Sequence, residues 1–341
     1  MTLVAEPLGT ASAVRFTPGR ATLVLGGLFG LLLLAFAASL ALGEYPVQLA
    51  RAFAEPGSPD GRVLFGLRIP RAVLGALVGA SLAASGSALQ ALLRNPLADS
   101  FVLGVSGGAA LGATLALALG LQALAAPSVF AFVGAVAAMT LVLAAGRARS
   151  SPYAALLTGV VFNAFAAAVI TCIKTLLTPD RLGEVLYWLA GSLGYERPRT
   201  LVLGGVLQVV ALGLLWAASA RLNLLSLGDD EAASLGVNVR RTRALVLVAT
   251  SLSVAGAVAL AGLIGFVGLI VPHVLRLWLG PDQRLLVPAS ALGGAAFLVL
   301  ADAMTRVLFP IFHSEPPVGV VTAVLGGPLF VWLLNRGEHP A

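Results

Sequence analysis

The chain has 341 residues, of which 59% are hydrophobic and only 11% are charged. Soluble domains carry about 25% charged residues, so this composition excludes a soluble globular protein and predicts that lipid solvates most of the chain. The formal net charge of +6 comes from arginines scattered between apolar runs, and we expect no nucleic-acid partner.

Ten apolar segments predict transmembrane helices, because a hydrocarbon core about 30 Å thick requires about 20 helical residues. They cover residues 22–42, 70–92, 102–120, 128–146, 154–177, 201–219, 243–261, 263–279, 286–306 and 317–335. The first is longer than the apolar region of a signal peptide and is interpreted as a retained span. The seventh and eighth form one almost unbroken stretch that must turn near Gly262, which leaves open two spans or one long one. The predicted fold class is an all-α polytopic membrane protein.

Arginine placement favours an orientation with both chain termini in the cytoplasm. Arginines cluster in the connections at residues 147–149 and 221–243. The bends predicted for the opposite face, near Gln122 and Gly262, carry no cation. The connections with clustered arginines are therefore expected to be cytoplasmic.

The chain divides into a cytoplasmic tail at residues 1–20, a transmembrane domain at 21–336 and a second cytoplasmic tail at 337–341. Ten helices split into five plus five, and an odd number per half makes the second half enter the membrane from the opposite face. Inverted-repeat transporters have this arrangement. At an offset of 176 residues, the matching positions are Gly86, Pro96 and Gly104 with Gly262, Pro272 and Gly280.

The stretch SLGDDEAASLG places three acids in a row between two apolar segments. Asp229 is suited to cap a short surface helix with Asp230 and Glu231 in its first turn. Gly236 can end that helix in the left-handed conformation, and Asn238 is expected to cap the next span. Because this helix is small and apolar along AASL, it suits a partner's groove better than lipid. A solvated loop is the simpler alternative.

Three arginines lie at the ends of predicted spans. Arg68 and Arg71 flank Pro70 at the start of the second span, and Arg306 ends the ninth. A cation at the centre of the bilayer costs about 3 kcal/mol on insertion scales, so all three should lie at the membrane interface. They either extend to the interface as isolated side chains or form a positive outer rim that receives an acidic protein surface.

Several absent motifs narrow the function. A phosphate-binding P-loop needs a lysine after glycine, but the only lysine, Lys174, follows Ile173, so ATP hydrolysis by that motif is excluded and we expect no enzyme activity. The 3 histidines lack the spacing of metal ligands, and no metal site is predicted. Asp302 is the only acid deep in a predicted span, which disfavours ion-driven transport. A stand-alone secondary transporter or channel remains the alternative function.

Five stretches between about residue 20 and residue 336 carry a family resemblance. They read RIPRAVLGALVGASLAASGSALQALLRNPLADSFVLGVSGGAALG, LGDDEAASLGV, GLIGFVGLIVPHVLRLWLGPDQRLLVPASALGGA, LVLADAMTR and EPPVGVVTAVLGGPLFVWLL. Together they resemble the FecCD-type permeases of ABC importers, the membrane subunits that take up siderophore-bound iron, haem or vitamin B12. In the last stretch this chain reads EPPVG, where relatives commonly carry ELPVG. The fold is expected to be the same, but the outer surface is expected to differ in detail.

The resemblance implies a multi-pass subunit of the cell inner membrane that works in a complex. The implied partners are a second permease chain in a homodimer or a pair of similar chains, two cytoplasmic ATP-binding subunits and one extracytoplasmic substrate-binding protein. The chain itself is expected to bind no cofactor, with ATP and Mg²⁺ held by the partner ATPase. The sequence does not distinguish a siderophore, haem or corrinoid substrate.

The resemblance also assigns residues to roles. Coupling to the ATPase, within the loop at 221–242, falls on Gly228, Asp229, Glu231, Ala232, Ala233, Leu235 and Gly236. Docking of the binding protein falls on Arg68, Arg71 and Arg306, and the cytoplasmic gate on Asn95, Leu97 and Ser151. The translocation path is expected to be lined by small polar side chains of the fifth span, among them Thr158, Asn163 and Thr171.

Overall fold

The computed structural model describes residues 17–43, 45–99, 101, 103–121, 125–149, 152–194 and 198–337, and every regular element among them is a helix. The apolar helices are α1 (Pro18–Ala41), α4 (Ile69–Leu92), α5 (Val105–Ala118), α6 (Ala126–Arg149), α7 (Pro152–Thr175), α9 (Pro198–Leu225), α11 (Val239–Ala261), α12 (Val267–Leu279), α13 (Gln283–Val307) and α15 (Val318–Gly337). The connecting elements are α2 (Leu49–Ala54), α3 (Pro59–Val63), the π-helical turn η1 (Leu64–Arg68), α8 (Pro179–Ala190), α10 (Asp229–Ser234) and α14 (Phe309–Phe312). The all-α fold class is confirmed.

Seven of the described helical segments are long and apolar enough to cross a membrane. Each of the ten predicted spans coincides with an apolar helix, but α5, α12 and residues 318–332 of α15 are shorter. With 14 and 13 residues, α5 and α12 are each about 20 Å long, less than the hydrocarbon core of about 30 Å. The non-helical backbone beside them must therefore be surrounded by protein if these segments cross the bilayer.

The long apolar stretch of the seventh and eighth predicted spans forms two helices. α11 ends at Gly262, whose φ of +69° suits glycine, and α12 begins after Phe266, which has a φ of +70°. α5 likewise follows a left-handed residue, Gly104, with a φ of +78°. Each half of the chain thus contains one short apolar helix that starts at a left-handed residue.

The matches at an offset of 176 residues do not mark equivalent local structures. Gly86 lies inside α4, whereas Gly262 ends α11. Pro96 lies in a turn, whereas Pro272 lies inside α12. These residue matches are therefore no support for a repeat, and the correspondence between α5 and α12 is the better structural argument for one.

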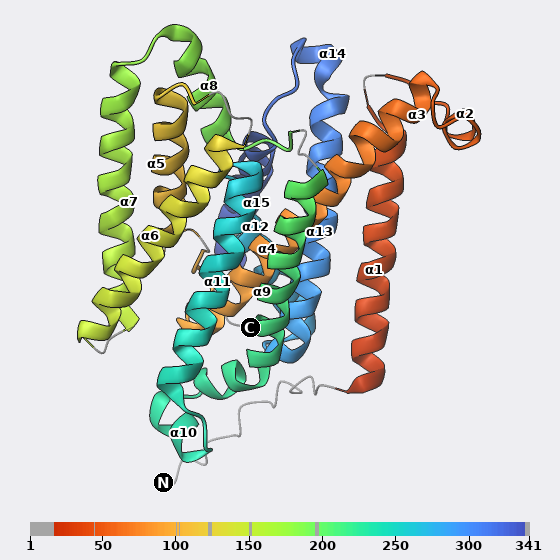
Figure 1. Ribbon diagram of the computed structural model, residues 1–341. Coiled ribbons are helices and arrows are strands. Elements are labelled where there is room, and N and C mark those ends of the chain that lie inside the picture. The colour runs from red at the N-terminus through yellow and green to blue at the C-terminus, as the bar shows by residue number, and fades with distance from the viewer. Residues whose placement is uncertain are drawn as a thin grey trace.

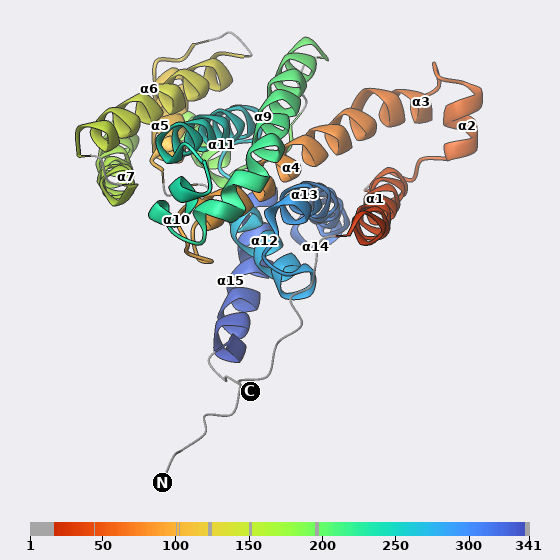
Figure 2. The ribbon, with the colours of Figure 1, turned by 90° about the horizontal axis from the view of Figure 1, so that it is seen from below.

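α4 lies at the centre of the bundle and packs against α9, α11, α12 and α13 (Figures 1 and 2). In the most apolar window of the helical segment that contains α4, 78% of the residues are buried, against 11% for α1. α1 and α7 lie on opposite sides of the bundle in both views. α10 lies at one end and α2, α3, α8 and α14 lie at the other, so we call these the α10 end and the α14 end (Figure 1).

Glycines allow the central helices to approach each other closely. A Cβ added at Gly79 of α4 would lie 2.2 Å from the carbonyl oxygen of Gly294 in α13. A Cβ added at Gly108 of α5 would lie 2.3 Å from the carbonyl oxygen of Gly134 in α6. Both distances are far below van der Waals contact, so these crossings depend on the missing side chains.

Three glycines from distant parts of the chain meet where α8, α11 and α15 come together, and we call this contact the glycine junction. Gly191 follows α8, Gly262 follows α11, and Gly319 lies in the first turn of α15. The backbone amide of Gly319 donates to the carbonyl of Gly191 at 3.1 Å. The backbone amide of Ser192 donates to the carbonyl of Ala261 at 2.9 Å. Backbone groups outside helices thereby satisfy each other.

A buried polar cluster joins α4, α9 and α11. The side-chain carbonyl of Gln208, which is fully buried, accepts hydrogen bonds from the hydroxyls of Ser81 at 2.6 Å and Ser253 at 2.9 Å. Its amide donates to the backbone carbonyl of Ser253 at 2.9 Å. The cluster satisfies the amide group of Gln208 inside the bundle and fixes the register of three helices.

Candidate functional site

The acidic stretch forms the short helix α10, as the sequence predicts. Its N-cap is Gly228, so Asp229 is the first helical residue and not the cap. Gly236 has a φ of +84°, which confirms the left-handed stop. Asn238 accepts a hydrogen bond from the amide of Arg241 at 3.0 Å, which confirms it as the cap of α11.

Asp229 connects α10 to two other parts of the chain. Its carboxylate accepts hydrogen bonds from Arg94 at 2.7 Å and from Arg243 of α11 at 2.6 Å. Arg94 also donates to the backbone carbonyl of Leu225, the last residue of α9, at 2.9 Å. Since Asp229 and Arg94 are more than 40% exposed, these pairs add little stability, and their main effect is to fix the position of α10.

The predicted gate residues Asn95 and Leu97 form the turn that directly follows Arg94. The side-chain oxygen of Asn95 accepts a hydrogen bond from the amide of Leu97 at 2.9 Å, and its backbone carbonyl accepts one from Ala98 at 3.1 Å. Arg94 has a φ of +50°, in the left-handed region. The turn and α10 are thus joined by one arginine. The third predicted gate residue, Ser151, lies outside the described residues.

The surface of α10 is small and apolar at its centre. Ala232 is fully buried against the bundle, whereas Ala233 is exposed. Leu227 and Leu235, on either side of the helix, are 65% and 59% exposed. Exposed leucines beside a polar turn at one end of the molecule are typical of a surface that a partner covers.

Arg68 is buried within the chain, which differs from the exposed rim expected from the sequence. Its side chain is 5% exposed, and its guanidinium donates to the backbone carbonyls of Leu40 and Tyr45. It therefore satisfies a carbonyl group in the last turn of α1, where a cation also interacts favourably with the helix dipole, and one in the connection that follows. In the isolated chain Arg68 holds α1 against the rest of the bundle.

Arg71 and Arg306 share the buried carboxylate of Asp302. Arg71 donates to Asp302 at 2.9 Å and to Glu315 at 2.7 Å, and it is 23% exposed. Arg306 is 6% exposed and lies 3.4 Å from Asp302, and it also donates to the hydroxyl of Ser39 at 2.6 Å. Of the three arginines predicted to form the rim, only Arg71 therefore has a partly exposed guanidinium.

A cavity of about 300 Å³ lies between α5, α7 and α8. Two of the three predicted path residues, Asn163 and Thr171, line it together with Lys174, Ile170 and Leu263. Thr158 lies further along α7 and is not a lining residue. The lining is mostly apolar and carries one cation.

Asn163 also has a structural role that the sequence did not indicate. Its side-chain oxygen accepts a hydrogen bond from the amide of Gly107 at 3.0 Å, and its amide donates to the carbonyl of Phe101 at 3.1 Å. Gly107 lies in the first turn of α5, where Gly104, the N-cap, has no side chain to accept this bond. Asn163 therefore caps α5 from a neighbouring helix.

Replacing Asn163 by alanine should lower the apparent Tm of the purified protein by several degrees. The half-buried amide of Gly107 would lose its acceptor, and a typical hydrogen bond contributes about 1 kcal/mol to stability. Thr171→Ala is the matched control, because Thr171 lines the same cavity but bonds only to Ala167 of its own helix. Equal Tm values for both variants, measured by thermal unfolding in detergent, would contradict the capping role.

Two polar connections at the α10 end were not predicted. Gln90 of α4 accepts a hydrogen bond from Arg276 of α12 at 2.6 Å. Asp282 accepts one from Asn223 of α9 at 2.7 Å, and hydrogen bonds from Arg284 lower the pKa of this carboxyl below its ordinary value. Gln90 and Asn223 are amide side chains near the ends of apolar segments, and this feature of the sequence could have indicated polar contacts between helices.

Within the ranges that the structure covers, no group of three or more His, Cys, Asp or Glu side chains is arranged to hold a metal ion. The features of this site are a bundle of apolar helices, a short surface helix linked to a turn, and a cavity beside α7. They are those of a polytopic helical protein of membrane type. The chain belongs to the FecCD transport family, whose model matches residues 31–336.

Two permeases and one solved structure are similar to the chain over most of its length. The chain is 43% identical to the cobalamin import system permease of Halobacterium salinarum over 85% of this chain and 79% of the other. It is 41% identical to the hemin transport system permease of Yersinia pestis over 79% of this chain and 82% of the other. A solved structure described as an inward-facing metal-chelate type ABC transporter superposes with a TM-score of 0.82 at 32% identity, covering 93% of this chain and 99% of that one.

Proposed function

We propose that the chain is the membrane-spanning permease subunit of an ATP-driven importer for an iron-siderophore, haem or corrinoid. Family membership supports the transport class, and the names of the relatives supply the three substrate classes. The observation that carries the mechanism is the link from Asp229 of α10 through Arg94 to the turn at Asn95. A displacement of α10 would act on that turn through one side chain.

In this proposal the chain performs no chemistry. Two cytoplasmic ATP-binding subunits hold ATP and Mg²⁺ and receive α10 with its flanking Leu227 and Leu235. ATP binding favours one arrangement of these subunits, and their differential affinity for two positions of α10 shifts the permease between two states. The residues assigned to coupling are Gly228, Asp229, Glu231, Ala232, Ala233, Leu235 and Gly236, and the gate residues are Asn95, Leu97 and Ser151.

We further propose ten membrane crossings in five plus five helices, with both termini in the cytoplasm. The coincidence of each predicted span with an apolar helix supports the count, and the short helices α5 and α12 at equivalent places support the two halves. α1 begins at the α10 end in Figure 1, which agrees with a start on the cytoplasmic face.

Cysteine labelling tests this orientation. A single cysteine at position 230 should react with a membrane-impermeant maleimide only after the cells are opened, because α10 is expected to face the cytoplasm. Cys172→Ala is the necessary background, since Cys172 is exposed. A cysteine at position 180, in the first turn of α8 at the α14 end, is the matched control and should be labelled in intact cells. Labelling of position 230 from outside would refute the orientation.

Docking of an extracytoplasmic binding protein at the α14 end is proposed to involve Arg71 directly. Arg71 is partly exposed and is held by Glu315, which an incoming carboxylate can replace. Arg68 and Arg306 contribute by holding α1 and α13 in place around it. Charge complementarity at such a surface raises the association rate and fixes the register of the complex.

We propose that the cavity beside α7 belongs to the translocation path, with Asn163 and Thr171 at its wall and Thr158 further along the helix. In this arrangement a second permease chain faces α7, where Leu157, Val161 and Phe165 are each about 60% exposed. A homodimer is the simplest such arrangement, and the substrate would pass between the two copies.

Reconstitution in liposomes separates this proposal from a stand-alone secondary transporter. Uptake of a cobalamin, haemin or ferric-siderophore probe should require the ATPase, the binding protein and ATP together. Uptake by the permease alone, driven by a proton or sodium gradient, would support the rival function. The pairing of Asp302 with two arginines favours the importer, because an ion relay needs an acid free to exchange its ion.

A further inference from the structure

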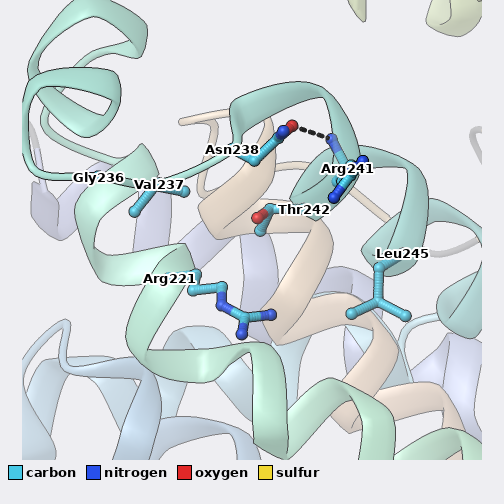
Figure 3. Close-up of a pocket in the computed structure, with 7 residues that line it drawn as sticks. All are labelled: Arg221, Gly236, Val237, Asn238, Arg241, Thr242 and Leu245. Atoms are coloured by element: carbon cyan, nitrogen blue, oxygen red, sulfur yellow. Dashed lines mark hydrogen bonds between the residues drawn. The ribbon is translucent and has the colours of Figure 1, made fainter.

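A second cavity, of about 470 Å³, lies at the α10 end where α9 and α11 meet. Figure 3 shows its lining, in which Arg221 comes from α9 and Arg241 from the first turn of α11. Val237 and Leu245 give the same cavity an apolar part. The cavity borders the docking surface of α10, because Gly236 belongs to both, and it is separate from the cavity beside α7.

The cavity carries positive charge that nothing in the described part of the chain neutralises. No carboxylate is among its lining residues. The guanidinium groups of Arg221 and Arg241 have no hydrogen-bond acceptor and no ion-pair partner among the described residues, in contrast to Arg94 and Arg243, which share Asp229. Two unpaired guanidinium groups beside one space favour an anion with several acceptor oxygens, since arginine binds phosphate through two parallel hydrogen bonds.

The position of the cavity indicates the source of that anion. Arg221 lies one turn before the end of α9, and Arg241 lies at the start of α11, and both helices are long and apolar enough to cross a membrane. We therefore infer that both arginines lie at the level of lipid headgroups. Leu214 and Val210 lie about two and three turns further into α9 on the same face as Arg221, and they are 38% and 55% exposed. A ligand with a phosphate at this level and an apolar tail beside α9 fits this arrangement.

We propose that this cavity binds the headgroup of an anionic phospholipid from the leaflet at the α10 end. The phosphate lies between Arg221 and Arg241, and the acyl chains follow the apolar face of α9. This binding site adds to the transport function and does not depend on which substrate is carried.

Native mass spectrometry tests the site with protein purified from nanodiscs that contain equal amounts of phosphatidylglycerol and phosphatidylcholine. Wild type should retain phosphatidylglycerol selectively. Arg221→Gln and Arg241→Gln should each weaken this retention about fivefold, and the double variant about 25-fold, because each arginine at an anionic surface strengthens binding by about that factor. Arg241→Lys should keep most of it. Arg240→Gln is the matched control, since Arg240 is exposed on the same turn but is not a lining residue.

Three outcomes would overturn the proposal. The first is equal lipid selectivity in the double variant and wild type, with both proteins monodisperse. The second is thermal stabilisation by inorganic phosphate in detergent, lost in the double variant, without any preference for phosphatidylglycerol, which would assign the cavity to a free anion. The third is loss of ATPase co-purification in the double variant with lipid retention unchanged, which would indicate an acidic protein partner.

Discussion

Replacing Ala233 by proline should abolish transport while the protein still inserts into the membrane. α10 has only 6 residues, and proline inside a helix costs about 3 kcal/mol, which is enough to unfold a helix of this length. Ala233 is exposed, so the bundle itself loses no contact. In the proposed assembly, the ATPase would then have no rigid helix to hold. The measurements are co-purification of the ATPase and ATP-dependent uptake in liposomes.

Asp230→Asn is the control for this variant. Asp230 is exposed and forms no side-chain hydrogen bond or ion pair among the described residues, so it interacts mainly with the helix dipole. Its neutralisation should therefore cost at most about 1 kcal/mol and leave transport nearly unchanged. Ala233→Trp keeps the helix but adds bulk to its outer face, and should also prevent assembly if this face fits a partner's cleft. If the Ala233→Pro variant still assembled normally with the ATPase, α10 would be an ordinary solvated connection and not a coupling helix.

Replacing Asp302 by alanine should destabilise the fold strongly. Asp302 is 1% exposed and balances Arg71 and Arg306, so its removal leaves two cations without their shared anion. Breaking a buried ion pair by removing one partner typically costs about 3–5 kcal/mol. We expect a large fall in apparent Tm and in the yield of monodisperse protein, measured by size-exclusion chromatography of heated samples.

Glu315→Ala is the matched control for Asp302→Ala. Glu315 also pairs with Arg71 but is 32% exposed, so its removal should cost at most about 1 kcal/mol. A double variant with Asp302→Leu and Arg306→Leu should recover part of the stability, because apolar residues can replace a buried pair. Equal stability of Asp302→Ala and Glu315→Ala would show that the cluster is not structural. Charge reversal at Arg68 or Arg306 is a poor test of docking for the same reason, since it also breaks buried contacts.

Local features of this protein were predictable from the sequence, whereas contacts between distant segments were not. The stop at Gly236, the cap at Asn238 and the turn at Asn95 depend on residues within a few positions of each other, where glycine and Asx chemistry decide the outcome. The short lengths of α5 and α12 were hidden, because apolar residues continue past the helix ends. Hydropathy reports burial in an apolar medium and does not report where the backbone stops being helical.

In the candidate site, too, local features were predictable and contacts between distant residues were not. The sequence indicated that α10 exists and that Asp229 matters, but assigned Asp229 to a local cap. Its partner Arg94 lies 135 residues away in the chain, and Arg71 lies 231 residues from Asp302. Such pairs depend on how the helices pack, which a single sequence does not specify. The arginines at the span ends were correctly placed near helix termini, but their burial depends on partners that the sequence does not reveal. Arg68 donates to carbonyls at the end of α1, Arg71 to Asp302 of α13, and Arg306 to Ser39 of α1.

The left-handed backbone at Arg94 places conformational strain at the start of the turn at Asn95. A φ of +50° costs a side-chain-bearing residue about 1–2 kcal/mol relative to its preferred conformations. Two backbone hydrogen bonds offset that cost, from the amide of Arg94 to the carbonyl of Ala91 at 3.2 Å and from the amide of Asn95 to that of Gln90 at 3.1 Å. The contacts of the guanidinium with Leu225 and Asp229 add to them. If α10 moves away, the guanidinium contacts are lost and the strained backbone keeps only its local hydrogen bonds, so the turn becomes easier to rearrange.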